Sequence, residues 1–165
     1  MSETKLGTAM NAFAPDGELK GRLDLQANID SLSCIIDSTQ ATAIKAGTPV
    51  KVIATSSKLP HIVAAASGDL ILGFVKHSPR KESFAAGEVV EVSYGGDVMY
   101  LEADAAIDAG VPVNVTDFTD MAVAKIGTSA GSTVGFALEK ATAAGQLIRV
   151  LLRTPVQHVA NADAS

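Results

Sequence analysis

Hydrophobic and polar residues alternate along much of the chain, and this alternation predicts β-strands. In 50–53 (Val-Lys-Val-Ile) the two valines fall on one face of a strand and the lysine falls on the other. Apolar stretches of about five to seven residues recur between turn residues such as Gly, Pro, Asp and Ser. The predicted strands are 33–37, 50–53, 62–66, 70–75, 88–94, 98–102, 111–115, 121–126, 133–138 and 146–153. For 62–66 a helix also fits the pattern, and 104–109 is expected to form a short helical turn or loop.

The chain also contains an internal repeat. The pattern I-x-A-G-x-P-V-x-V occurs twice, and two later landmarks, G-F-[VA] and A-A-G-[EQ]-[VL]-[VI]-x-V, follow each copy in the same order. The three landmarks and their second copies are 44–52 and 107–115, 73–75 and 135–137, and 85–92 and 143–150. Three matched landmarks in one order indicate a duplicated unit. The repeated residues belong to turns and strands and carry no reactive groups, so the duplication indicates a scaffold that displays surface.

Strands and repeat together predict a mainly β fold, a small barrel or sandwich built from two pseudo-repeated halves. A chain of 165 residues is long enough for one domain, or for two small domains that share a core. Residues 1–40 are expected to form an extended N-terminal arm, since little periodicity is visible before Leu23. The duplicated domain is placed at 41–155, with copies at about 41–103 and 104–155, and 156–165 is expected to be a flexible tail.

Composition narrows the function classes. Aromatic residues make up 4% of the chain and tryptophan is absent, so Val, Ile, Leu and Ala must build the core. The formal net charge of −5 argues against a nucleic-acid partner. No apolar stretch is long enough to cross a bilayer, and no signal peptide is expected at the N-terminus. Cys34 is the only cysteine and is expected to be a buried thiol; the lack of disulfides fits folding in a reducing cytoplasm.

Candidate metal ligands and nucleophiles are scattered. His61, His77 and His158 lack the spacing of a metal site, and none of them stands near Cys34 as a catalytic partner. The carboxylates in 117–120 lack the spacing of a calcium-binding loop, so solvated turn residues are favoured there. These residues predict neither a metal nor a cofactor.

One segment matches the sequence pattern of a hydrolase motif. Residues 127–131 read G-x-S-x-G with Ser129 at the centre, and the order Ser129, Glu139, His158 fits a catalytic triad. The nucleophile elbow requires a helix directly after the serine, whereas Thr-Val-Gly-Phe at 133–136 is a poor helix start. A hairpin loop is therefore the favoured interpretation.

A second segment is similar to a sequence motif of carrier domains. Glu-Lys-Ala at 139–141, followed by Gly145, is similar to the lysine-bearing turn of lipoyl and biotinyl domains. Lys140 would be the modified residue in that alternative. The short motif is weak, and an ordinary surface lysine is favoured.

The three repeated landmarks, taken in order, resemble those of bacteriophage capsid decoration (cement) proteins, which are broadly similar in role to the lambda head decoration protein. The resemblance covers about 41–155. It implies a non-enzymatic structural protein, without cofactors, that sits on the outer surface of the virion head and clamps neighbouring major capsid subunits. It further implies self-association, as a homotrimer or alternatively a dimer, no nucleic-acid or membrane partner, and synthesis in the cytoplasm of the host bacterium.

The arm offers a way to hold the capsid. Leu19, Leu23, Leu25 and Ile29 are expected to supply apolar anchors to the capsid, with packing on this chain's own barrel as the alternative. Three other function classes stay open beside the cement protein. They are another virion part, such as a head fibre base or a tail-tube subunit; a carrier or ligand-binding β-barrel; and an enzyme that uses Ser129.

Overall fold

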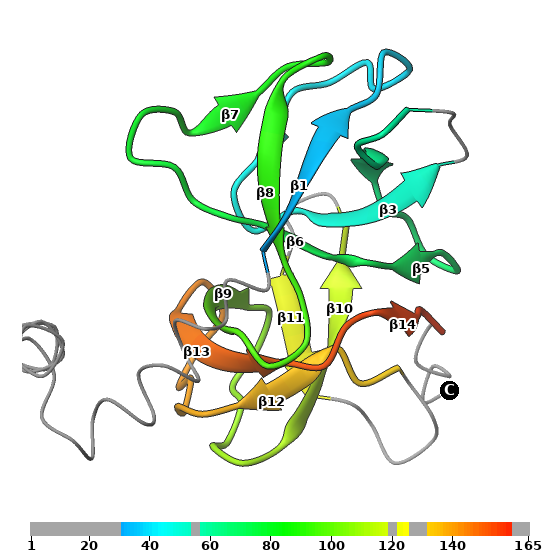
Figure 1. The fold of residues 1–165 in the computed structure, drawn as a ribbon. Coiled ribbons are helices and arrows are strands. Elements are labelled where there is room, and N and C mark those ends of the chain that lie inside the picture. The colour runs from blue at the N-terminus through cyan, green and yellow to red at the C-terminus, as the bar shows by residue number, and fades with distance from the viewer. Residues whose placement is uncertain (1–30, 54–56, 119–121, 126–131, 160–165) are drawn as a thin grey trace, which may run out of the picture.

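A computed structural model describes residues 31–53, 57–118, 122–125 and 132–159, with only the backbone described for 122–125. Within these ranges the regular structure consists of strands, and no helix is present (Figure 1). The mainly β fold predicted from the alternating pattern is therefore confirmed. The segment 62–66, for which a helix also fitted, forms a strand at His61–Ala64.

The first half of the described chain closes into a small barrel. Its strands are β1 (Ser31–Ile36), β3 (Pro49–Ile53), β4 (His61–Ala64), β6 (Gly73–Val75) and β8 (Val89–Ser93). Around the barrel the order is β1-β4-β3-β6-β8. Strands β1 and β4 run parallel, and the other neighbours run antiparallel.

The second half repeats this barrel strand for strand. Its strands are β9 (Val98–Ala103), β10 (Pro112–Asp117), β11 (Ala122–Lys125), β12 (Gly135–Ala137) and β13 (Leu147–Leu152). The order is β9-β11-β10-β12-β13, again with a single parallel pair, here β9 and β11. The two halves inferred from the repeated landmarks thus share one topology, and each half closes on itself.

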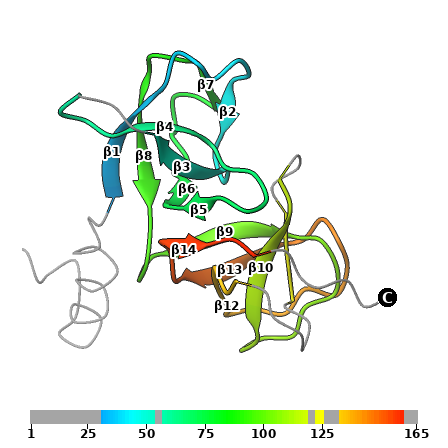
Figure 2. The same ribbon diagram turned by 90° about the vertical axis from the view of Figure 1, so that its right-hand side faces the viewer.

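Two short pairings complete the fold. In the first half β2 (Ile44–Lys45) pairs with β7 (Ser83–Phe84), and an isolated bridge between Ile107 and Ala141 takes the same place in the second half. The other pairing joins the halves, because β5 (Leu70–Ile71) belongs to the first and β14 (Val156–Gln157) follows the second. Figure 2 shows the two barrels one above the other, with β5 and β14 between them.

The repeated glycine of the G-F landmark allows a close strand contact in each barrel. A Cβ atom on Gly73 would lie 2.1 Å from the carbonyl oxygen of Ser93, and one on Gly135 would lie 2.4 Å from that of Leu151. Backbone atoms cannot yield at such distances, so only glycine allows these strands to approach. The sequence repeat therefore records a steric requirement of the barrel.

The repeated A-G turn is also explained by the backbone. Gly47 and Gly110 have φ angles of 82° and 80°, in the left-handed region that favours glycine. Each donates its N–H to a carbonyl of the neighbouring strand, Gly47 to Val75 at 2.8 Å and Gly110 to Ala137 at 2.7 Å. The turn therefore directs the chain into β3 in one barrel and into β10 in the other.

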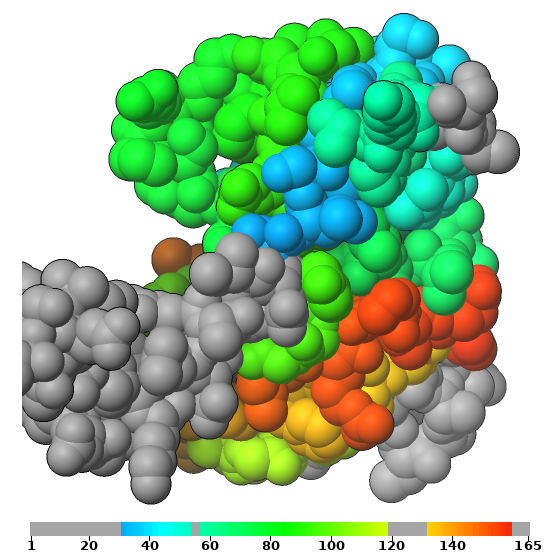
Figure 3. Space-filling view, viewed as in Figure 1, coloured from blue at the N-terminus to red at the C-terminus, as the bar shows by residue number. Residues whose placement is uncertain are grey.

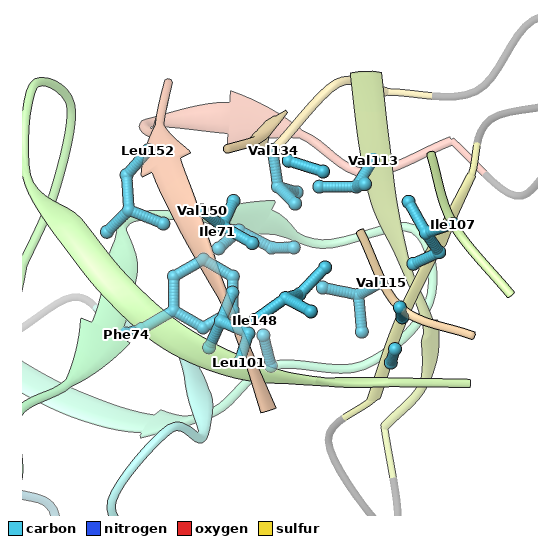
Figure 4. Packing of buried hydrophobic residues seen from close by; sticks show 14 residues of the cluster. Ile71, Phe74, Leu101, Ile107, Val113, Val115, Val134, Ile148, Val150 and Leu152 are labelled. Carbon is cyan, nitrogen blue, oxygen red and sulfur yellow. The ribbon is translucent and has the colours of Figure 1, made fainter. Parts of the chain in front are cut away.

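The two barrels share part of one core. Cys34, Ile36, Val50, Val90 and Val92 belong to the cluster that fills the first barrel. The larger cluster fills the second barrel, but it also contains Ala65, Ile71 and Phe74 from the first. Figure 4 shows Ile71 and Phe74 among Leu101, Ile148 and Val150 of the second barrel.

Several expected boundaries differ from those of the barrels. The segment 1–40, expected to be an arm, includes β1, which is a full strand of the first barrel. The second barrel begins at β9, before the expected copy boundary at 103/104, because β9 pairs with β13 and β11. Residues 104–109, expected to form a short helical turn or loop, form a loop with one isolated bridge at Ile107.

The expectation of a flexible tail from residue 156 is wrong for its first residues. Val156 and Gln157 form β14, and His158 is only 3% exposed. This contact with β5 is non-local in the sequence, and the Ala, Asn and Asp composition of the tail gives no sign of it. Residues 160–165 lie outside the described part of the chain.

Candidate interaction surfaces

The four predicted capsid anchors, Leu19, Leu23, Leu25 and Ile29, lie outside the described residues. What the structure places is the point at which the chain enters the first barrel. Ser31 opens β1 and pairs with Ser93 at the end of β8. Ser93 in turn lines a cleft between the barrels, so the N-terminal segment joins the body beside that cleft.

The cleft has a volume of about 690 Å³ and lies between the barrels. One wall comes from the first barrel and carries Lys76, His77 and Ser93, which are polar. The other wall comes from β9 and β13 and is mainly apolar. The apolar wall consists of Val98, Met99, Tyr100 and Leu147.

The apolar wall continues over the outer face of the second barrel. Tyr100 is 61% exposed and Leu147 is 64% exposed, although both belong to barrel strands. Leu138, which follows β12, is 44% exposed. Large apolar side chains that stay exposed in a group mark a surface that binds a partner.

His158 joins the two barrels on another side of the junction. Its backbone N–H donates to the carbonyl of Asp69 at 2.8 Å. Its Nδ1 accepts the N–H of Gly68 at 3.2 Å, so Nε2 carries the proton and donates to the carbonyl of Val115 at 3.1 Å. The ring also packs edge to face on Phe118, with centroids 4.7 Å apart. Figure 3 shows the C-terminal segment, in red, against green residues of the first barrel.

His61 also has a structural partner. Its Nδ1 lies 2.8 Å from Oδ2 of Asp37, and Thr39 donates its N–H and hydroxyl to Oδ1 of the same carboxylate. The bond to His61, followed by those from Thr39, lowers the pKa of Asp37 to about 2. These contacts tie the end of β1 to the start of β4 and leave the carboxylate ionised.

Cys34 is fully buried in the core of the first barrel, as expected from its apolar neighbours. Burial raises the pKa of its thiol to about 11, so the thiolate form is suppressed at neutral pH. A neutral, buried thiol is not a nucleophile.

The described residues of the candidate triad and of the carrier motif make other contacts. Ser129 lies outside the described residues. Glu139 accepts a hydrogen bond from Arg149 at 2.6 Å, and His158 is held by the backbone contacts given above. Lys140 is exposed, with its Nζ 3.4 Å from Asp108, which is an ordinary surface ion pair.

Among the described residues, no group of His, Cys, Asp and Glu could hold a metal ion. In the same part of the chain, no helix has the length and apolar character needed to span a membrane.

These observations define a double β-barrel scaffold that presents surfaces for binding a partner. The chain belongs to the structural cement protein family of bacteriophages (E217 gp24/Pam3 gp6), whose family model matches residues 9–153. Its role is therefore structural, and it stabilises the phage capsid by binding capsid subunits. The family predicted from the three repeated landmarks is confirmed, and the match extends into the N-terminal segment that the landmarks did not cover.

Among solved structures, the chain is similar to the N base of the head fibre protein gp8.5 of bacteriophage phi29. The identity is 17% and the TM-score is 0.48, and the likeness covers 78% of this chain and 99% of the other. No curated protein matches the chain significantly.

Analysis of the sequence alone missed the apolar outer face of the second barrel. A signal for it was present, because Tyr100 and Leu147 occupy outward positions of alternating strands. The position of the first copy that is equivalent to Tyr100 holds the small Ser33, so a comparison of the two copies would have revealed the difference.

Proposed function

We propose that the protein decorates the outer surface of the phage head, where it bridges neighbouring major capsid subunits as a homotrimer, with a dimer as the alternative. The observation that carries this proposal is the duplicated barrel within a chain of the cement family. Two barrels with one topology present two related surfaces on one rigid body. A single chain can therefore contact two adjacent subunits at once, which multiplies the effect of each weak contact.

The N-terminal segment is proposed as the anchor. Leu19, Leu23, Leu25 and Ile29 supply apolar side chains that bind a groove or sheet edge of the capsid protein. Support comes from the place where the segment joins the body, beside the cleft between the barrels. An extended segment that becomes ordered on binding can cover a large area of its partner.

The proposal includes what the protein does not do. It carries out no catalysis and binds neither nucleic acid nor membrane, in keeping with its acidic charge and with the engagement of Cys34, Glu139 and His158 in structural contacts. It is made in the cytoplasm of the host bacterium and then joins the virion.

Co-sedimentation with phage heads tests this function. Purified protein is added to DNA-filled heads that lack it, so that only the outer surface is accessible. We expect the full chain to saturate the heads, and a variant with Leu19, Leu23, Leu25 and Ile29 all changed to Ser to bind at least tenfold more weakly. The control is Val52→Ser, which changes an exposed residue of the first barrel and should bind like the original chain.

Each result has a separate meaning. If the full chain does not bind filled heads, the decoration function is wrong. If the full chain binds and the quadruple Ser variant binds equally well, the segment is not the anchor and the barrels alone make the contact.

A further inference from the structure

The first barrel serves as an internal reference for the second. Because both have the same strand order and register, every outward position of β9, β12 and β13 has a counterpart on β1, β6 and β8. Six outward positions of the second barrel, which we call the outer face, are apolar. They are Val98, Tyr100, Phe136, Leu138, Leu147 and Leu151. Their counterparts in the first barrel are, in the same order, Ser31, Ser33, Phe74, Lys76, Val89 and Ser93.

The fold itself does not require apolar residues at these positions. In the first barrel four of the six are polar, and two of these, Ser31 and Lys76, contact the side chain of Glu91. Ser31 donates its hydroxyl to Glu91 at 2.7 Å, and Lys76 lies 3.9 Å from the same carboxylate. Ser93 is buried, but Ser31, Ser33 and Lys76 are at least partly exposed. Polar residues at these three positions are therefore compatible with this backbone, and the apolar outer face of the second barrel requires another explanation.

The chain itself shows what can cover such a face. Phe74 and Phe136 occupy the same place in the repeated G-F landmark, yet Phe74 is fully buried and Phe136 is half-buried. Phe74 is buried because the second barrel packs over it. The guanidinium of Arg153 lies over Phe136, 5.5 Å from the ring centroid. The surface around Phe74 thus accepts another barrel of the same fold. Within the described residues no barrel lies over Phe136, and Tyr100 and Leu147 line the open cleft toward the first barrel.

The outer face also carries one basic residue. Arg149 lies at the centre of the outer face, opposite Tyr100 in the register, and its counterpart in the first barrel is the exposed Glu91. The guanidinium of Arg149 is already paired within the chain, because its Nε lies 2.6 Å from Oε1 of Glu139, so the charge of Arg149 does not by itself select the partner.

We propose that the outer face of the second barrel is the surface through which copies of this chain associate, by packing against a barrel of a second copy. This deepens the homo-oligomer of the proposed function and rests on it. In a cyclic trimer the contact is heterologous, so the outer face of one copy meets a different surface of the next. Tyr100 and Leu147, the most exposed members, are the central contacts.

Analytical ultracentrifugation of the full chain over a broad concentration series tests the proposal. The variant is Tyr100→Ser combined with Leu147→Ser, which places on the second barrel the serine that the first barrel has at Ser33. The control combines Val52→Ser with Leu59→Ser, two exposed positions of the first half. We expect the original chain and the control to be oligomers. The Tyr100/Leu147 variant should associate at least tenfold more weakly and sediment as a 16.9 kDa monomer at low concentration.

Folding is checked by circular dichroism and thermal unfolding, which these exposed substitutions should leave unchanged. A variant that remains as oligomeric as the original chain overturns the proposal, and so does an original chain that is monomeric at every concentration. If the variant keeps its oligomeric state but loses binding to heads, the outer face contacts the capsid and the proposal is again wrong. If the original chain assembles as expected but does not bind heads, the decoration function fails while the self-association surface stands.

Discussion

Asp37 is the single residue whose charge has the clearest structural consequence. It accepts hydrogen bonds from Thr39 and contacts His61, and these contacts are made by the ionised carboxylate. They lower its pKa from 3.8 to about 2 in the folded protein. Because the folded state favours the charged form, Asp37 stabilises the fold fully above its ordinary pKa, and the contribution is lost as the pH falls from about 4 to about 2.

We therefore predict that Asp37→Asn is less stable than the original chain at neutral pH and that the difference shrinks as the pH falls from about 4 toward 2. Urea unfolding followed from neutral to acidic pH measures this. Asp108→Asn is the matched control, since Asp108 is 69% exposed and makes only a surface ion pair. A stability difference that stays constant over the acidic range would show that the ionised Asp37 has no special role.

Among the elements, β14 and the residue after it connect the two barrels. β14 adds to β5 of the first half, and His158 links Gly68 and Asp69 to Val115 of the second half. The histidine is only 3% exposed and uses both ring nitrogens. Its removal takes away the partner of the carbonyl of the buried Val115 and of the N–H of Gly68, together with the packing on Phe118, which is costly.

We predict that His158→Ala lowers the free energy of unfolding by about 2–4 kcal/mol, as expected for lost buried hydrogen bonds together with lost packing. Chemical denaturation measures the loss, and hydrogen exchange at the Gly68 amide should speed up because its acceptor is gone. His77→Ala, at an exposed position, should change stability by less than about 0.5 kcal/mol. Unchanged exchange at Gly68 would refute the role assigned to the histidine ring.

At the scale of the whole molecule, the shared core joins the two barrels into one body. Ala65, Ile71 and Phe74 belong by sequence to the first half but pack in the cluster of the second. Neither barrel can therefore unfold without exposing apolar surface of the other. Phe136 occupies the equivalent position in the second barrel, but it does not belong to this cluster and stays half-buried.

This difference yields a comparison between equivalent residues. We predict that Phe74→Ala costs about 3–5 kcal/mol, as for a fully buried aromatic residue, and that Phe136→Ala costs roughly 1 kcal/mol. Calorimetry should show one cooperative transition for the original chain. Equal costs at the two positions, or two separate transitions in the original chain, would show that the barrels are independent.

The strands, the turns and the duplication could be predicted because they depend on local rules. Alternation places Val50 and Val52 on one face, and the glycines at 47 and 110 are needed for the same turn. The strand predicted at 70–75 is instead divided into β5 and β6, because its first part pairs with β14 and its last part with β3 and β8. That pairing joins residues far apart in the chain, which no local pattern reports.

The sequence by itself determined the β class, the duplicated unit and the cement family, since each follows from residue types at fixed spacing. Only the tertiary structure decided that each half closes into its own barrel, that β1 is a barrel strand and that His158 is buried. Only the tertiary structure shows that Phe74 is buried whereas Phe136 is half-buried. The same motif places both side chains on the outside of a barrel, but whether an outward side chain is covered depends on the position of the other barrel.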